Sequence, residues 1–299
     1  MERKIGHIDN ELVQGDLPSK PIFFIMGVAR SGTTLLSQFL AENTNLCYPN
    51  NILSRFYFSP MLGSMISQIL IDFDHLGEFQ TEKDQKYSSR LGKTSGLNAP
   101  HEFWYYWRKF FKISEDQKLL SSDVQGFTHG LKKIQLAHDA PLFMKGMIMN
   151  WNIPFLYKNI DNCFFIFIKR DICFNTQSIL ESRQEFYGDY GEWYSFKNPE
   201  FKKLEKLSAV EQVYNQVFLT NKSISEGLNK IPNNNYFEIS YESFCQSPQK
   251  IIDFVTNICG SDLAKSDTDS VEFENKNFWK ISQKIKNQIV SYHNSFTEY

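Results

Sequence analysis

The stretch Pro21-Ile-Phe-Phe-Ile-Met-Gly-Val-Ala-Arg-Ser-Gly-Thr-Thr-Leu-Leu36 decides the fold of this 299-residue chain. Residues 21–28 form an apolar run rich in β-formers and bounded by a proline and a glycine, which predicts a buried strand. After a short turn, apolar side chains recur at helical spacing, at Leu35, Leu36, Phe39 and Leu40. The predicted order is therefore strand, tight turn and helix.

Three later segments have the same strand character, residues 140–147, 162–169 and 235–240, with helical patterns at about 172–184 and 205–230. Strands that alternate with helices predict an α/β fold in which a mostly parallel, P-loop-like central sheet is flanked by helices. We expect one domain over residues 1–299. Within it, residues 57–139 are rich in aromatic and charged residues, and we interpret them as a mostly helical insertion that forms the acceptor region.

Composition narrows the classes of function. A chain that is 41% hydrophobic and 15% aromatic can bury a substantial core. The formal net charge of −2 gives no overall basic field, so we expect no nucleic-acid partner. The first twenty residues hold no apolar signal segment and the longest apolar runs are too short for a bilayer, which predicts a cytoplasmic protein without a membrane span. Five cysteines without CxxC spacing indicate reduced, buried thiols.

The turn after the first predicted strand has the GxxxxG frame of a phosphate loop, from Gly27 to Gly32. In such a loop, backbone N–H groups and a helix N-terminus converge on an anion. Thr33 stands where a nucleoside-triphosphate enzyme has the lysine that binds the β- and γ-phosphates, and the cation is Arg30 instead. This pattern suits a single phosphate bonded to the group being transferred. A degenerate glycine turn with a surface arginine is the alternative.

The run Arg30-Ser31-Gly32-Thr33-Thr34 after a strand resembles the 5'-phosphosulfate loop of the sulfotransferase superfamily. In that family a strand ends in an arginine, and a serine eight positions later in the next helix helps it to hold the cofactor's 3'-phosphate. FFIFIKRDICFNTQSIL supplies both, as Arg170 and Ser178. Two such side chains can converge on the crevice at the carboxyl ends of parallel strands. For Arg170 alone, a surface salt bridge is the ordinary interpretation.

A weaker match is YFEISYESFCQSPQKIIDFV, residues 236–255, which resembles the family's late strand and the proline-initiated helix after it. We interpret Tyr241 and Glu242 in this segment as structural. In outline the resemblance covers residues 20–260. It implies a P-loop-like fold and a sulfuryl donor, 3'-phosphoadenosine-5'-phosphosulfate (PAPS), which is converted to 3'-phosphoadenosine-5'-phosphate (PAP) when the sulfuryl group passes to a hydroxyl or amine.

Sulfuryl transfer requires in-line attack, positive charge on the bridging and equatorial oxygens, and a base when the acceptor is an alcohol. Arg30 can supply the first charge. Lys145 ends a predicted strand 25 residues before Arg170, approximately where many relatives place a lysine near the transferring group. The alternative for Lys145 is a solvated strand end.

The usual general base of the family has no counterpart here. Met147 occupies the position of the histidine in cytosolic relatives, and residues 43–56 lack the glutamate that relatives acting on protein tyrosines use. The best remaining candidates are His101 and Glu102, a polar pair at the start of an aromatic-rich helix after Pro100. For Glu102, a cap that favours the helix dipole is the alternative.

Other candidates have mainly structural interpretations. His129 and His138 fit surface or packing positions, and no histidine cluster has metal-site spacing, so we expect no metal. The aromatic run 103–107 cannot face one side of a helix, so part of it must be core and part can line a pocket. Tyr214, Arg183 and Trp193 can reach the adenosine or the acceptor, although packing is their ordinary role.

Two other functions remain open. A nucleotide kinase would need a lysine at position 33 and magnesium. A non-catalytic nucleotide-binding scaffold would keep the phosphate sites and lack the base. The sequence does not choose among carbohydrate, lipid or polyketide-like alcohol, phenol and peptide acceptors. We favour a bacterial type of enzyme that acts on a carbohydrate or small aliphatic alcohol, because no anchor typical of Golgi relatives is present in the sequence.

Overall fold

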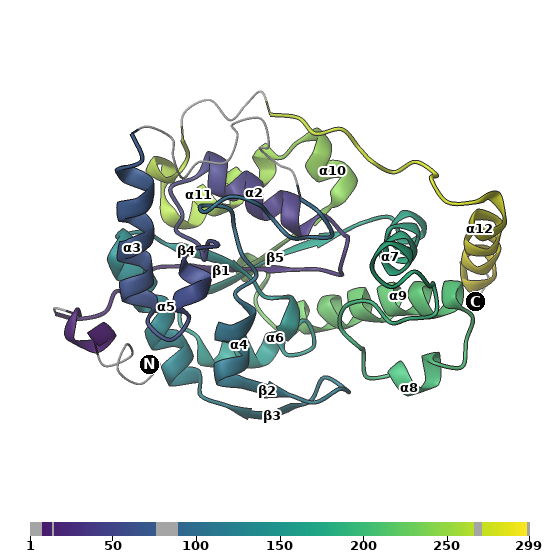
Figure 1. The fold of residues 1–299 in the computed structure, drawn as a ribbon, viewed down its shortest axis with the longest axis horizontal. Coiled ribbons are helices and arrows are strands. Elements are labelled where there is room, and N and C mark those ends of the chain that lie inside the picture. Colours follow the sequence, from purple (N-terminus) through teal and green to yellow (C-terminus); the bar gives the residue numbers. More distant parts are fainter. Residues whose placement is uncertain (1–7, 14, 76–88, 266–270, 298–299) are drawn as a thin grey trace.

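The computed structural model describes residues 8–13, 15–75, 89–265 and 271–297 (Figure 1). Its strands, α-helices and 3₁₀ helices (η) are, in chain order, β1 (Ile22–Met26), α2 (Thr33–Asn43), η1 (Leu53–Phe56), α3 (Pro60–Asp72), α4 (Trp104–Phe110), β2 (Phe111–Ile113), β3 (Leu119–Ser122), α5 (Val124–His138), β4 (Leu142–Lys145), η3 (Met147–Met149), α6 (Ile153–Asn159), β5 (Cys163–Lys169), α7 (Ile172–Tyr187), α8 (Phe201–Leu204), α9 (Ala209–Leu228), η4 (Asn233–Asn235), β6 (Tyr236–Ser240), α10 (Tyr241–Gln246), α11 (Gln249–Cys259), η5 (Ser261–Leu263) and α12 (Gln283–Thr297).

The central sheet has the strand order β4-β1-β5-β6, and every neighbouring pair in it is parallel. The four predicted strands and the α/β class are therefore confirmed, as are the helices expected near 172–184 and 205–230. Because the strands run in one direction, their carboxyl ends share one edge of the sheet. The ends of β4, β1 and β5 lie next to one another there.

Helices cover both faces of the sheet, and β1 is buried along its whole length. Phe23 and Ile25 pack into the core under α2, α10 and α11, whereas Phe24 and Met26 pack into the core on the opposite face, with α4, α5 and α6. Figure 1 shows these two helical layers on either side of the strands. A strand that is covered on both faces reads as a continuous apolar run, which is the pattern of residues 22–26.

The predicted insertion, residues 57–139, contains α3, α4 and α5, but also the antiparallel hairpin of β2 and β3. The expected aromatic helix ends at Phe110, and Phe111 starts β2, where its buried ring contacts Phe127 at a centroid distance of 4.9 Å. Trp107 packs against Phe24 of β1. The segment thus supplies α4 and α5 of the layer that covers this face of the sheet.

The C-terminal part was not anticipated from the sequence. Residues 271–282 follow an extended path that leads to α12, which packs against α7 and α9 (Figure 1). The hydroxyl of Tyr214 in α9 lies 2.8 Å from Nδ1 of His293 in α12. Among the described residues, the structure has no helix with the length and apolar character that a membrane crossing requires.

A buried ion pair connects the N-terminal segment to the insertion. Asp9 Oδ2 accepts a hydrogen bond from Lys133 Nζ at 2.8 Å, and the two side chains are 2% and 5% exposed. The other carboxylate oxygen of Asp9 accepts from the Leu62 amide at 3.0 Å. Removing one member of such a pair leaves the other charge buried without compensation.

We therefore expect Asp9→Asn to lower the free energy of unfolding by about 3 kcal/mol, measured by urea denaturation. The control is Asp139→Asn, because the Asp139 carboxylate pairs with Lys20 while 95% exposed. That change should cost no more than about 1 kcal/mol. Equal effects of the two substitutions would contradict a structural role for the buried pair.

Candidate active site

A cavity of about 1630 Å³ opens at the carboxyl ends of β1, β4 and β5. The loop after β1, the start of α2, the loop 89–102, α7 and residues 273–280 all contribute to its wall. Its volume exceeds the roughly 300–1,000 Å³ of a typical site for one small ligand. The cavity therefore has room for two ligands side by side.

The loop between β1 and α2 has the backbone conformation of an anion-binding turn. Gly32 has φ 106°, and a Cβ atom there would lie 2.8 Å from the Tyr241 ring, so only glycine fits without displacement. Arg30 has φ 68°, a left-handed conformation that costs a non-glycine residue about 1 kcal/mol and is typical of functional sites. This turn directs the chain straight into α2.

Two buried asparagines fix the carbonyl groups of this loop. Asn150 Nδ2 donates to the Gly27 carbonyl at 2.9 Å, and Asn175 Nδ2 donates to the Ala29 carbonyl at 2.9 Å. The first amides of α2 have no acceptor within the helix, and Gly32 has no side chain to cap them. Gly32, Thr33 and Thr34 line the cavity, so these amides are placed where they could hold an anion.

The predicted loop residues do not all face the cavity. Arg30, Gly32, Thr33 and Thr34 line it. Ser31 is fully buried, its hydroxyl lies beside Gly27, and its amide donates to the Val28 carbonyl at 3.2 Å. Ser31 therefore stabilises the loop from the protein interior and does not line the cavity. The sequence around Ser31 did not indicate that this side chain is buried. The backbone angles of a turn decide which of its side chains face the interior.

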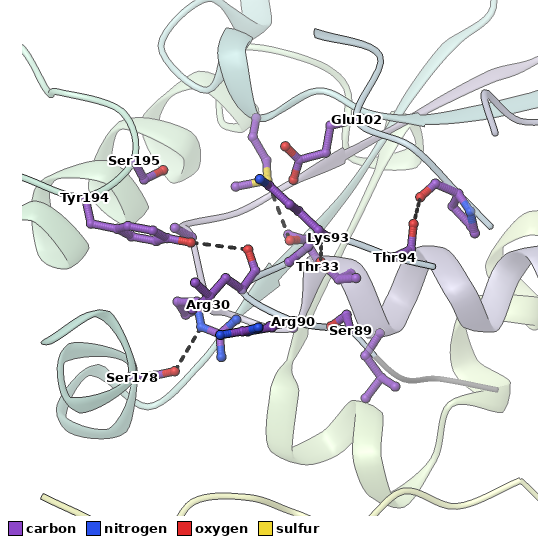
Figure 2. A pocket seen from close by; sticks show the side chains of 18 of the residues that line it. Arg30, Thr33, Ser89, Arg90, Lys93, Thr94, Glu102, Ser178, Tyr194 and Ser195 are labelled. Carbon is purple, nitrogen blue, oxygen red and sulfur yellow. Dashed lines mark hydrogen bonds between the residues drawn. The ribbon is translucent and has the colours of Figure 1, made fainter. Parts of the chain in front are cut away.

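Arg170 and Ser178 meet Arg30 at one end of the cavity, which we call the donor end. Arg170 follows the last residue of β5 and Ser178 lies in α7. Arg30 Nε donates to Ser178 Oγ at 3.2 Å (Figure 2). Arg170 Nη1 donates to the Arg30 carbonyl at 3.3 Å. Burial lowers the pKa of Arg170, with Tyr241 and Glu242 opposing the shift, but a guanidinium remains charged. The donor end thus suits a polyanion.

The extended C-terminal segment covers the donor end. Arg170 Nε donates to Asn277 Oδ1 at 2.7 Å, and Gln177 Oε1 accepts from the Lys280 amide at 3.0 Å. Lys276 and Lys280 line the cavity. These residues were missed from the sequence because they lie about 100 positions from their partners and beyond the stretch that carried the resemblance. Tyr241, expected to be structural, packs its ring against Arg170 and also borders the cavity.

At the other end of the cavity, Glu102 lines the wall with a side chain that is 27% exposed, and it pairs with the buried Lys145 behind it. Lys145 closes β4, is 5% exposed, and donates to Thr34 Oγ1 at 2.7 Å and to Glu102 Oε1 at 3.2 Å. The second carboxylate oxygen of Glu102 accepts from the Trp104 indole. Since α4 begins only at Trp104, Glu102 is not a residue of its first turn. Its partners are the side chains of the site.

His101 precedes the helix as well. Its Nδ1 accepts from the Phe103 amide at 2.9 Å, while Phe103 itself has a left-handed backbone, with φ 55°. Burial lowers the pKa of His101, Glu102 opposes this, and Arg55 and Lys145 lower the pKa further. The ring is therefore neutral at pH 7, and the bond to Nδ1 places its proton on Nε2.

The residues proposed for adenosine or acceptor contact lie elsewhere. Tyr214 packs against α12, and the buried Arg183 donates to the Tyr190 carbonyl at 2.9 Å beneath Trp193. None of these three borders the cavity. Of the aromatic run, Phe103, Tyr106 and Trp107 are core residues and Trp104 lines the cavity, as the helical geometry required. No group of three His, Cys, Asp or Glu side chains in the described ranges is placed to hold a metal ion.

Comparison with known proteins agrees with this architecture. Two similar solved structures are the sulfotransferase STF1 from Mycobacterium tuberculosis H37Rv, with a TM-score of 0.52 and 10% identity over 98% of this chain and 76% of that chain, and the sulfotransferase STF9 from Mycobacterium avium, with a TM-score of 0.53 and 12% identity over 98% and 72%. At such identities the likeness concerns the fold.

No curated protein matches the sequence. A sequence profile described as the sulfotransferase family matches residues 21–265, which include the sheet, the phosphate loop, the insertion and the Arg170–Ser178 segment. The chain therefore belongs to the sulfotransferase family.

Proposed function

We propose that this protein transfers a sulfuryl group from PAPS to a hydroxyl or amine, with a carbohydrate or small aliphatic alcohol as the favoured acceptor. The observation that carries the proposal is the division of one cavity. Its donor end joins the loop amides to Arg30, Arg170 and Ser178, and its other end holds Glu102 beside Lys145. We call the Glu102 side the acceptor end.

The donor end fits the charges of PAPS. The amides of residues 32–34 and the Arg30 guanidinium would hold the 5'-phosphosulfate, and Arg170 with Ser178 would hold the 3'-phosphate. When bound there, PAPS supplies a sulfuryl group joined to a phosphate leaving group. The role of the protein is then to position both reactants and to stabilise negative charge as it moves to the leaving phosphate.

Arg30 and Lys145 would provide that stabilisation. Arg30 lies in the loop that receives the phosphate, so its charge acts on the bridging oxygen. Lys145 is held by Thr34 at 2.7 Å and by Glu102, so its ammonium is fixed between the phosphate loop and the acceptor end. Fixed charges in a largely buried site stabilise developing charge more strongly than mobile charges in water.

Glu102 is the better of the two candidate bases. A carboxylate oxygen can accept a proton from an acceptor hydroxyl, whereas the neutral His101 has its Nδ1 occupied by the Phe103 amide and its proton on Nε2. Glu102 would take the acceptor O–H proton as the acceptor oxygen bonds to sulfur and the bond from sulfur to the phosphate oxygen breaks. The products are the sulfate ester, PAP and a proton released to solvent.

The alternatives have less support. A kinase would need a lysine at position 33, but Thr33 directs its hydroxyl to the Met147 sulfur at 3.6 Å. A non-catalytic scaffold has no need of a carboxylate and a buried ammonium at the acceptor end. Transfer to any acceptor would exclude the scaffold.

The first prediction concerns the donor end. Calorimetry with PAP in the absence of magnesium should give micromolar binding, and Arg30→Ala and Arg170→Ala should each weaken it by about 2 kcal/mol, or about thirtyfold, because each loses a charge-assisted contact. Lys169→Ala is the matched control, since this neighbouring cation pairs with Glu238 on β6 and should change the Kd less than about twofold. Binding of ATP only with magnesium, or no binding of PAP, would contradict the proposal.

The second prediction concerns the base. Glu102→Gln keeps the side-chain shape and an acceptor for the Trp104 indole, but removes the basic carboxylate. We expect the rate of ³⁵S-sulfuryl transfer to the first alcohol that the wild type accepts to fall by about 10² to 10⁴. PAP affinity should hardly change, whereas the melting temperature should fall by a few degrees because the buried Lys145 ammonium loses its charged partner. His101→Asn should cost far less, and the opposite order of the two losses would transfer the base assignment to His101.

A further inference from the structure

A tight turn in the loop 89–100 lies against the phosphate loop. The Arg90 amide donates to the Lys93 carbonyl at 3.0 Å, and the Lys93 amide donates to the Arg90 carbonyl at 2.9 Å. The two central residues, Leu91 and Gly92, both have positive φ, 51° and 81°, as a type I′ turn requires. A leucine in this conformation is uncommon and costs about 1 kcal/mol, so contacts outside the turn must maintain it.

Those contacts come from the site itself. The Leu91 carbonyl accepts from the Tyr194 hydroxyl at 3.3 Å, and the Gly92 carbonyl receives a long hydrogen bond from Thr34 Oγ1 at 3.5 Å. Thr34 Oγ1 is also the atom that accepts from Lys145 Nζ. Lys93 directly follows Gly92 in the chain, and the Thr34 hydroxyl that contacts the Gly92 carbonyl is also the acceptor for Lys145.

The Lys93 side chain lines the cavity. Figure 2 shows it extending toward the side where Thr33 and the Glu102 carboxylate lie. Two of the carboxylates that line the same cavity have other cationic partners, because Glu102 pairs with Lys145 and Glu185 with Arg90. Within the described ranges, no ion pair includes Lys93. The Lys93 side chain is exposed, but the anchored turn holds its backbone beside the phosphate loop, and the side chain extends over the cavity toward Glu102 (Figure 2).

We infer that Lys93 is a further catalytic residue, whose ammonium binds the non-bridging oxygens of the sulfuryl group. The inference rests on the proposed function. During transfer these oxygens remain negatively charged while the bond to the leaving phosphate breaks, and a cation placed on them keeps the group oriented for in-line attack. Lys93 then contacts the one group that distinguishes PAPS from PAP.

This difference gives a test that needs no acceptor. We would measure the Kd values of PAPS and of PAP by calorimetry at low temperature for the wild type, Lys93→Gln and Lys93→Arg. Lys93→Gln should weaken PAPS binding about tenfold through loss of a charged contact, and change PAP binding less than about twofold. Lys93→Arg should keep most of the affinity for PAPS because it keeps the charge.

The control is Lys280→Gln, a lysine that lines the donor end of the same cavity. It should change the two Kd values by the same factor. An equal effect of Lys93→Gln on PAPS and PAP, or no effect on either, would overturn the assignment of Lys93 and leave the proposed function intact. Failure of the wild type to bind either nucleotide would overturn the proposed function and the inference together.

Discussion

The parallel pairing of β1 with β4 and β5 is the constraint on which the site depends. In this register Ile25 of β1 lies beside Lys145 of β4, and Met26 beside Phe167 of β5. Because the strands are buried on both faces, their interiors must be apolar, and polar groups collect where the strands end. These polar groups are Lys145, the loop that begins at Gly27, and Arg170. One sheet edge thereby brings together three segments that are far apart in the chain.

The second requirement is that the loop after β1 has its carbonyl groups satisfied by the protein. Asn150 and Asn175 do this, and both side chains are almost completely buried. With the carbonyls of Gly27 and Ala29 occupied, the amides at the start of α2 are left for a ligand. An anion site made in this way depends on packing as much as on the glycines of its motif. The left-handed backbone of Arg30 is held as well by Arg170, which donates to the Arg30 carbonyl.

The sequence predicted those features that local pattern determines. Continuous apolar runs identified the four sheet strands, and motif spacing placed Arg30, Arg170 and Ser178, which the structure brings to one cavity end. Features that depend on distant contacts were missed. The β2–β3 hairpin interrupts an aromatic run whose composition suits helix and strand equally, and the buried position of Ser31 follows from backbone angles that the sequence does not specify.

Three other features depend on contacts between residues that are far apart in the chain. They are the lysines of residues 273–280 that line the cavity, the asparagines that bind the loop carbonyls, and the turn that carries Lys93. Tyr214 was a candidate for ligand contact only because its partner helix, α12, was not predicted. The residues that the sequence analysis missed are mainly those that surround the motif residues and hold them in their orientation.

A crystal structure with PAP, grown without magnesium, tests the division of the cavity most directly. The expected density places the 5'-phosphate on the amides of residues 32–34 with Arg30, and the 3'-phosphate within hydrogen-bonding distance of Arg170 and Ser178. The ribose and adenine would then lie under residues 273–280, and Glu102 and Lys145 would face the open side of the 5'-phosphate. Density for the nucleotide at any other surface, or with its two phosphates exchanged, would contradict the assignment of donor and acceptor ends.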